Sequence, residues 1–350
     1  MTDERLTCVV PTHNRPHFLR RLLHLYRQFP PGFPFIIMDS SNPGAAAQNR
    51  EVVESFRDVL SIDYQHLDLN ITDKCVEGLK RVQSQYVVFC ADDDYLFPDT
   101  VWDCVNFLER EPDYATAMGR TAQLNPKFPR WCCRVLKGYS IEHSRPFDRC
   151  RELAANWFTN FYAVYRTATM LDIFQITAAN TNSSVNYHLP EMLFSQLSVL
   201  RGRVKIFPKM YSLMEKHSSN AGAAMRTGVR PDAESMYLRF KGCLVDQFVQ
   251  VGTDRSEAES FIDEEYGYFR ETDLSIRRRP RSTAELVRHW VSGIAEKAAP
   301  LANTGSNRHR RFIRTKDVES CGPVWNAAVQ LLKQFPLGIP ADQADLKRCA

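Results

Sequence analysis

Three adjacent carboxylates follow a short apolar run in the segment VVFCADDDYLFP, residues 87–98. Asp92, Asp93 and Asp94 would repel one another unless a positive charge lies close to them. Carboxylate oxygens on a short turn suit a hard divalent cation such as Mg²⁺ or Mn²⁺, which often shares its other ligand positions with phosphates. The alternative is a solvated acidic turn in front of a helix. The triplet by itself is compatible with both.

Strands and helices alternate around this triplet. Apolar, β-branched runs predict strands at 6–10, 35–38, 61–67, 86–90 and 114–117. Helical periods predict a helix that opens at Pro16, one over 72–82, and one capped by Asp99 or Thr100. Such alternation predicts an α/β fold with a mostly parallel sheet flanked by helices. Beyond Leu124 we expect extended runs at 160–165, 203–207 and 209–214 and helices at 167–176 and 191–200.

Polar clusters follow three of these strands at the point where each strand ends. They occupy residues 11–14, 39–41 and 92–94. In parallel α/β sheets ligands bind beyond the carboxyl ends of the strands. We therefore expect the three clusters to converge on one crevice.

Three segments, in this order, carry a family resemblance: LTCVVPTHNRPHFLRRLL, FIIMDSS and GLKRVQSQYVVFCADDDYLFPDTV. In residues, order and spacing they resemble the family 2 glycosyltransferases. The resemblance is clear over 6–119, extends more weakly to about residue 220, and is absent beyond. It implies a GT-A fold and an enzyme of the EC 2.4 class that moves a sugar from a nucleotide diphosphate donor to an acceptor.

The resemblance also implies a nucleotide pocket, which it places at Pro11, Thr12, Asn14 and Arg15. Asp39 would accept a hydrogen bond from the base, because a carboxylate suits the ring N–H of uracil and also that of guanine. UDP is the favoured donor nucleotide, with GDP as the alternative.

Lys74 is the candidate for the donor diphosphate, although relatives often carry an arginine one residue later, where Cys75 stands. An exposed helix lysine is the other interpretation of Lys74. Counted back from Pro98, the D-x-D of the family falls on Ala91 and Asp93. A shift by one residue gives Asp92 and Asp94 instead.

We therefore assign Asp93 and Asp94 to a Mn²⁺ or Mg²⁺ ion, and Asp92 to the metal, the ribose or sugar hydroxyls. His217, in the segment YSLMEKHSSN, resembles the histidine that many GT-A enzymes add as a metal ligand. A neutral imidazole suits Mn²⁺. A surface histidine in a polar turn is the competing interpretation.

An inverting transfer needs a base that takes the proton of the acceptor hydroxyl. Relatives place an acid, often a pair, at the start of a helix well after the D-x-D. Glu191 fits this position, because it follows Pro190 and opens an apolar helix. A carboxylate that only complements the helix dipole is the alternative.

Length and composition limit the number of domains that the chain can form. With 350 residues and 44% hydrophobic side chains it can form one large domain or two moderate ones. We expect a glycosyltransferase domain over 1–222, with a nucleotide-binding half over 1–124 and an acceptor-side half over 125–222. Residues 223–350 would form a mainly helical, basic extension.

A basic block at 276–316 carries eleven Lys or Arg residues and two Glu residues, in a chain of net charge +4. Its apolar stripe of Leu286, Trp290 and Ile294 predicts a helix that could lie on an anionic membrane surface. A core-packed helix with a solvated basic rim, or a contact in a homo-oligomer, is an equal alternative. Nucleic-acid binding is disfavoured, because no recognition motif accompanies the block.

The cellular location follows from what the sequence lacks. The N-terminus has no signal-peptide plan, and no apolar run approaches the roughly 20 residues that span a bilayer. Ten cysteines include no C-x-x-C pair. We expect a reduced, cytoplasmic protein, with peripheral docking at the inner face of the membrane as one interpretation of the basic block.

Sequence motifs distinguish a non-processive glycosyltransferase from other classes of enzyme. The Q-x-x-R-W element of processive synthases is missing, which favours a non-processive enzyme acting on a glycan or lipid-linked acceptor in surface polysaccharide synthesis. A nucleotidyltransferase would carry a glycine-rich loop where PTHNRP stands, and a hydrolase using Asp39 would want an aspartate at Ser41. A non-catalytic sugar-nucleotide-binding or assembly subunit remains the alternative.

Overall fold

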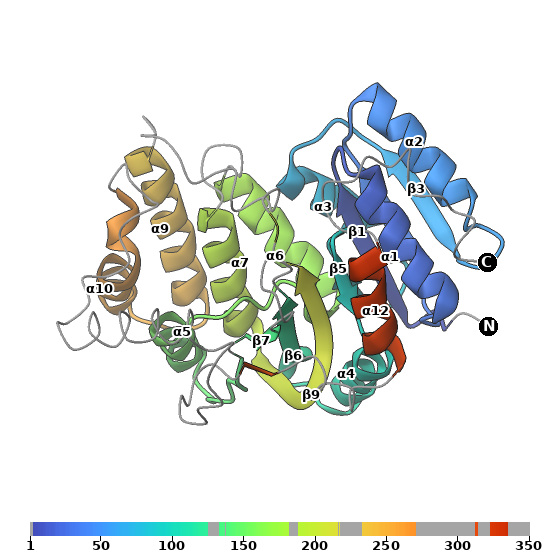
Figure 1. The fold of residues 1–350 in the computed structure, drawn as a ribbon. Helices are drawn as coiled ribbons and strands as arrows, with labels where there is room; N and C mark the ends of the chain where they lie inside the picture. Colours follow the sequence, from blue (N-terminus) through green and yellow to red (C-terminus); the bar gives the residue numbers. More distant parts are fainter. Residues whose placement is uncertain are drawn as a thin grey trace.

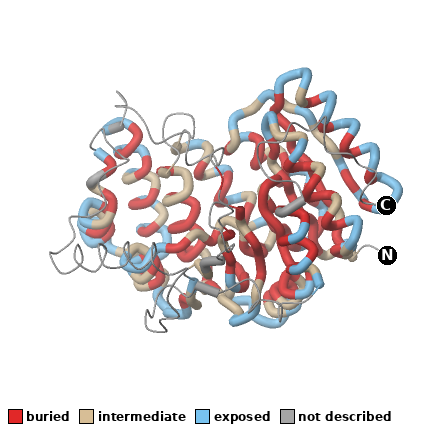
Figure 2. The backbone as a smooth tube through the Cα atoms, viewed as in Figure 1, coloured by how far each residue is buried: buried red, intermediate tan, exposed pale blue. Residues whose placement is uncertain are grey.

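The computed structural model describes residues 3–124, 133–136, 138–181, 188–215, 217, 233–270, 312–313 and 323–334. Figure 1 shows a sheet flanked by helices, with further helices at the end of the molecule away from both termini. Buried backbone follows the sheet and the inner faces of its helices, as Figure 2 shows.

The first half of the sheet is parallel. Its strands are β1 (Leu6–Thr12), β2 (Phe35–Asp39), β3 (Ile62–His66) and β4 (Tyr86–Phe89). β1 lies between β2 and β4, with Val9 opposite Ile36 on one side and Phe89 on the other. Because these strands run in one direction, their carboxyl ends meet at one edge, as the sequence predicted.

The helices of this half are α1 (Pro16–Gln28), α2 (Pro43–Glu54) and α3 (Ile71–Arg81). α1 opens with Pro16 and buries one apolar face, as predicted. α2 was not predicted, because its interior face is short and contains Asn49 between Ala46 and Val52. An interrupted apolar face gives little periodic signal.

The helix after the acidic triplet begins earlier than expected. α4 (Pro98–Arg110) has Phe97 at its N-cap, and no side chain caps it. The prediction that Asp99 or Thr100 would be the cap was therefore wrong. Pro98 suits the first helical position, and the Phe97 N–H already bonds to the carbonyl of Tyr211.

The second half of the sheet is mixed. It contains β5 (Asp94–Leu96), β6 (Tyr114–Leu124), β7 (Cys133–Val135), β8 (Val164–Arg166), β9 (Arg203–Glu215) and β10 (Phe312–Ile313). β9 runs parallel to β6 and antiparallel to β5. The two extended runs predicted at 203–207 and 209–214 are this one strand. A Cβ at Gly119 would lie 2.6 Å from the carbonyl oxygen of Lys209, so β6 and β9 approach closely where the register shifts.

The strand order of the sheet is β10-β7-β6-β8-β4-β1-β2-β3, with β5 attached through β9. Helices α5 (Pro146–Ala155), α6 (Thr167–Asn180) and α7 (His188–Arg201) belong to its second half. The fold is thus the predicted α/β class, with parallel strands in the N-terminal half of the sheet and mostly antiparallel pairs beyond β4.

The chain after residue 223 is mainly helical where the structure describes it. α9 (Ala233–Gln250), α10 (Arg255–Tyr266) and the short η1 (Gly267–Arg270) lie beside α5, α6 and α7 in Figure 1. α12 (Pro323–Gln334) returns to α1, and its buried Trp325 lies 5.9 Å from Phe97 between ring centroids. The basic block lies outside the described residues except for Phe312 and Ile313, as does the expected boundary at residue 222. Of the helices described, none has the length and hydropathy of a membrane span.

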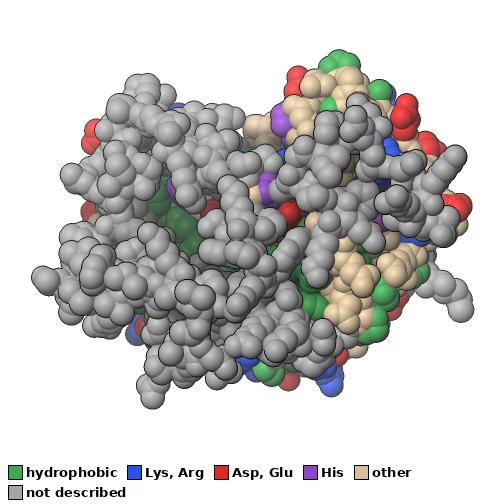
Figure 3. Space-filling view, in the orientation of Figure 1, with side chains coloured by type: hydrophobic (Ala, Val, Ile, Leu, Met, Phe, Trp, Pro, Cys, Tyr) green, Lys and Arg blue, Asp and Glu red, His purple; other side chains and the backbone are tan. Residues whose placement is uncertain are grey.

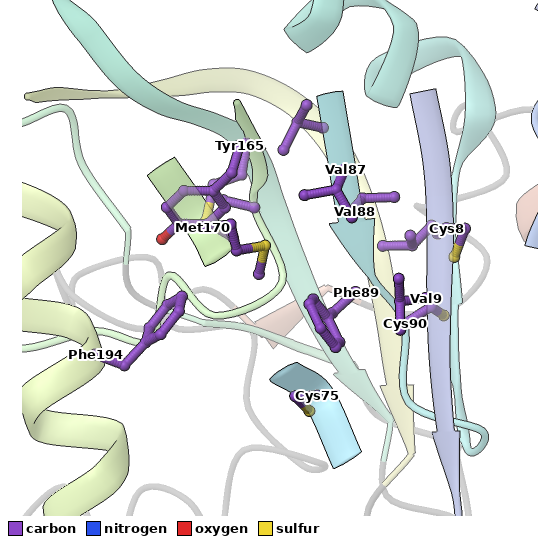
Figure 4. Packing of buried hydrophobic residues seen from close by; sticks show 14 of the residues in the cluster. Cys8, Val9, Cys75, Val87, Val88, Phe89, Cys90, Tyr165, Met170 and Phe194 are labelled. Carbon is purple, nitrogen blue, oxygen red and sulfur yellow. The ribbon is translucent and has the colours of Figure 1, made fainter. Parts of the chain in front are cut away.

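The core joins β1 and β4 to the helices of the second half. Figure 4 shows Phe89 at the end of β4, with Tyr165, Met170 and Phe194 on one side and Val9 on the other. Cysteines contribute here as small apolar groups. Cys75 is buried as a free thiol, and burial raises its pKa to about 12.

Candidate active site

The ends of β1 and β4 meet through side chains. Thr12, the last residue of β1, donates its hydroxyl to Oδ2 of Asp92 over 2.7 Å. Arg15 reaches the same place from the loop after β1. Its Nη1 lies 3.2 Å from Oδ1 of Asp92 and 3.1 Å from Oδ2 of Asp93. In this structure the cation among the carboxylates is therefore an arginine of the predicted nucleotide pocket.

The loops after β1 and β2 are fastened together. Asn14 has a positive φ of 55°, which asparagine tolerates better than most residues. Its backbone N–H donates to Oγ of Ser41 over 2.7 Å, and its side-chain oxygen accepts from the Asn42 N–H over 2.9 Å. Pro11 lies within β1, opposite Met38. All three predicted polar clusters thus lie at one edge of the sheet.

Asp39 is held as a carboxylate by three donors. Oδ1 accepts from the Ser41 N–H over 2.7 Å, and Oδ2 accepts from Asn49 over 2.9 Å and from the Tyr64 hydroxyl over 2.5 Å. Burial opposes ionisation, but these hydrogen bonds hold the pKa of Asp39 below its usual range. Asn49 and Tyr64 were not found from the sequence, because one lies on the unpredicted α2 and the other on β3 without a motif.

Lys74 lies beneath the site and is only 2% exposed. Its Nζ donates to the Thr12 carbonyl over 2.7 Å and to Oγ of Ser40 over 2.9 Å. Burial lowers the pKa of Lys74, and the charges of Asp92 and Asp39 act in the opposite direction. In this arrangement Lys74 ties the end of β1 to the end of β2, which the sequence did not indicate.

The three carboxylates of the triplet are not equivalent. Burial and the neighbouring Asp93 raise the pKa of Asp92. Burial acts on Asp93 too, but the His217 hydrogen bond and the charge of Arg15 hold its pKa below the usual range. Asp94 is buried in β5, and burial together with Asp93 raises its pKa well above the usual range. Of the three carboxyl groups, Asp93 therefore loses its proton most readily.

His217 lies beside this carboxylate. Its Nε2 is 2.7 Å from Oδ2 of Asp93, and both side chains are buried. The imidazole stacks on Phe18 of α1, with 4.7 Å between ring centroids. The structure thus brings together two of the predicted metal ligands and leaves Asp94 inside the sheet.

The pair suits a divalent metal in its donor types. A carboxylate oxygen and an imidazole nitrogen are ligands that Mn²⁺ accepts, and a diphosphate can supply further oxygens. Within the described ranges, no three His, Cys, Asp or Glu side chains form a ready-made metal cluster. Asp93 and His217 would accordingly hold a metal only together with other oxygen ligands.

Glu191 lies in the first turn of α7. Burial raises its pKa to about 7, while a hydrogen bond from Thr159 acts in the opposite direction. Phe194, one turn further along α7, lies 5.2 Å from Phe161, which lies 5.5 Å from Phe89 at the end of β4. These aromatic contacts link the start of α7 to the strand that precedes the acidic triplet.

Figure 3 shows acidic and histidine side chains near the middle of the visible face, next to exposed apolar surface. This region lies between the parallel strands and the helices of the second half, as comparison with Figure 1 shows.

Comparisons with known proteins bear on both fold and family. Residues 7–168 match the family model for glycosyl transferase family 2. No curated protein matches the sequence. The structure is similar to S. aureus TarS in complex with UDP-GlcNAc, with a TM-score of 0.55, 16% identity, and coverage of 85% of this chain and 82% of that one.

Two further structures of S. aureus TarS are similar. The complex with UDP has a TM-score of 0.52 and 14% identity, with 93% and 87% of the two chains covered. A longer TarS structure has a TM-score of 0.51 and 15% identity over 85% of this chain, but only 49% of that chain is covered. The present chain thus spans about half the length of that protein. Residues 7–168 form a glycosyl transferase family 2 domain, and the fold around it is that of the GT-A glycosyltransferases.

Proposed function

We propose that this glycosyltransferase moves one sugar at a time from a nucleotide diphosphate donor to an acceptor hydroxyl, with a divalent metal and with inversion at the anomeric carbon. The observation that carries the proposal is the contact of Asp93 with His217, 2.7 Å apart. This pair lies beside Asp92, which Thr12 binds at the end of β1. This carboxylate and this imidazole would hold the metal beside the donor diphosphate.

The nucleotide would bind over the ends of β1 and β2. Asp39 is ionised and fixed in orientation, and Oδ1 accepts only one hydrogen bond within the chain. Asp39 is 0% exposed in this structure, so a ring N–H of the base would reach Oδ1 after the surrounding loops open. Uracil is favoured and guanine is the alternative. TarS, which shares the fold, is found with UDP and with UDP-GlcNAc. Pro11, Thr12 and Asn14 would line the pocket.

The diphosphate would lie between the acidic triplet and the cations near it. Asp93 and His217 would hold Mn²⁺ or Mg²⁺, which neutralises charge on the leaving diphosphate when it is bound. Arg15 would turn from the carboxylates to the phosphates as these arrive. Lys74 remains a candidate for diphosphate binding. It would act indirectly, by holding the end of β1 at Thr12 and the end of β2 at Ser40. Asp92 is assigned to the ribose or the sugar, and Asp94 to support beneath the metal.

Glu191 would be the general base. A carboxylate with a pKa of about 7 is poised to accept a proton near neutral pH. As the acceptor oxygen bonds to the anomeric carbon, its proton passes to Glu191. The bond from that carbon to the diphosphate oxygen breaks, and the diphosphate leaves with the electron pair.

The proposed acceptor and cellular location are inferred from the sequence alone. We propose a glycan or lipid-linked acceptor in surface polysaccharide synthesis, in the cytoplasm or at the inner face of the membrane. Docking on anionic lipid through 276–316, or homo-oligomer formation there, belongs to the same proposal. The alternative is a subunit that binds sugar nucleotide on this fold without turnover.

Release of nucleotide from UDP-GlcNAc and GDP-mannose, with Mn²⁺ or with EDTA, separates these functions. We expect release of UDP or GDP in Mn²⁺ only. Glu191→Gln should lower the rate about 100-fold or more, since general bases contribute roughly 10²–10⁴-fold. The control is Glu257→Gln, an acid in the first turn of α10. Donor binding without release in the wild-type protein would favour the binding subunit.

A further inference from the structure

A buried ion pair shares an aromatic neighbour, Phe18, with His217 and includes none of the predicted site residues. Arg21 of α1 and Glu215 at the end of β9 are each 3% exposed. Nη2 of Arg21 donates to Oε2 of Glu215 over 2.5 Å. The two residues are 194 positions apart, so the pair joins the first helix of the domain to the last strand of the sheet.

The pair shares an aromatic neighbour with His217. The Arg21 guanidinium lies 5.0 Å from the centre of the Phe18 ring and 5.8 Å from that of Tyr95. His217 stacks on the same Phe18 ring at 4.7 Å. Phe18 therefore contacts both the ion pair and the imidazole. Tyr95 belongs to β5, the strand that follows Asp93 directly.

Glu215 links the end of β9 to α1 through its side chain. β9 ends at Glu215, and His217 follows two residues later. The ladder with β6 pairs Glu215 with Leu124 and holds the backbone of this strand end. The ion pair holds that end against α1, and α1 also carries Phe18.

Stability alone does not account for such a pair. The free-energy cost of removing two charges from water offsets most of the gain from their attraction. Apolar replacements of a buried ion pair are therefore often neutral or stabilising. A hydrogen-bonded pair, however, fixes direction, which apolar contacts do not. The ion pair is therefore better explained by the positioning of nearby residues than by stability.

We propose that Arg21 and Glu215 are positioning residues that aim His217 at Asp93 and thereby set the metal affinity. The proposal rests on the metal-dependent function given above. Both residues would act through His217 and not as ligands of the metal. Partners behind a metal ligand typically change metal affinity by roughly 10- to 100-fold when they are replaced.

The test measures Mn²⁺ binding by electron paramagnetic resonance, with UDP present, alongside the melting temperature. The variants are Glu215→Gln, Arg21→Lys and the double variant R21M/E215M. We expect Mn²⁺ affinity to fall roughly 10- to 100-fold in Glu215→Gln and in the double variant, and less in Arg21→Lys, which keeps the charge. UDP affinity in EDTA should stay at the wild-type value.

A second buried arginine provides the control. Arg149 donates to the carbonyls of Val199 and Leu200 on α7, away from the ion pair. Arg149→Met should lower the melting temperature and leave Mn²⁺ affinity unchanged. Because apolar replacement of a buried pair preserves folding, the double variant decides the question if Glu215→Gln is too unstable.

The outcomes separate this proposal from the function on which it rests. Mn²⁺ binding at wild-type affinity in a folded double variant would overturn the positioning role and leave the metal site intact. A wild-type protein that takes up no Mn²⁺ in the presence of UDP or GDP would overturn both.

Discussion

Asp93 and His217 stand 124 positions apart in the chain, and their side chains meet with Nε2 of the imidazole 2.7 Å from Oδ2 of the carboxylate. The pairing of β5 with β9 produces this contact. Asp94 lies opposite Met214 in that ladder, so the residue before β5 and the residues after β9 leave the sheet at the same end. The pairing of these two strands thereby brings together two candidate metal ligands from distant segments of the chain.

His217→Asn should weaken Mn²⁺ binding, because the amide is a poorer ligand than imidazole. We expect the Mn²⁺ affinity to fall roughly 10- to 100-fold or more, because replacing a residue that only supports a metal ligand already costs that much. Mn²⁺ titration followed by electron paramagnetic resonance, with UDP present, measures it. His143→Asn is the matched control, since His143 is exposed and pairs with Glu152. Equal affinities in the two variants would remove His217 from the metal site.

Activity should depend on pH through Glu191. Its pKa is raised to about 7 by burial, so the carboxylate is protonated below that pH and accepts no proton from the acceptor. We therefore expect kcat/KM to fall about tenfold per pH unit below this pKa and to level off above it. The residual rate of Glu191→Gln should lack this step. A wild-type profile that is flat between pH 5.5 and 8 would contradict the assignment.

Asp39→Asn should weaken binding of the base. The carboxylate accepts three hydrogen bonds within the chain, and the amide can replace only part of them. Hydrogen bonds to a charged group contribute about 1.5–3 kcal/mol, so we expect a roughly 10- to 150-fold higher Kd for UDP. Calorimetry with UDP and with pyrophosphate checks this. An equal loss for both ligands would show that Asp39 does not act through the base.

Lys74→Met tests how Lys74 acts. Its ammonium satisfies the Thr12 carbonyl and Ser40, so the variant leaves buried polar groups without this donor. We expect a loss of about 1–3 kcal/mol in the free energy of unfolding, and similar weakening of uridine and UDP binding. Denaturant unfolding and calorimetry measure the two effects. Weakening of UDP alone, at unchanged stability, would instead show direct contact with the diphosphate.

The sequence was sufficient for the parts that rest on local patterns. Alternating apolar runs and Pro16 predicted β1, α1, β2, α3 and β4, and the polar residues after each strand predicted one shared edge. The motif order around Asp39 and Asp93 predicted the family that the match over 7–168 confirms.

The remaining parts of the fold and site depend on contacts between residues far apart in the sequence, and such contacts produce no periodic pattern in the sequence. β5 has three residues, too few for a strand pattern, and it exists because β9 pairs with it. Tyr64 and Asn49 meet Asp39 only after β2, α2 and β3 have packed. Arg21 is buried against Glu215, 194 positions away, and no local pattern in α1 indicates this contact.

The most direct test of the metal site is a thermal-shift measurement with UDP and GDP, each in Mn²⁺ and in EDTA, on the wild type and on Asp93→Asn. A ligand that binds only the folded state raises the melting temperature by mass action. We predict a larger shift in Mn²⁺ than in EDTA for the wild type, and loss of that difference in Asp93→Asn. A nucleotide shift that is the same in EDTA, or no shift with either nucleotide, would contradict a metal held by Asp93 and His217.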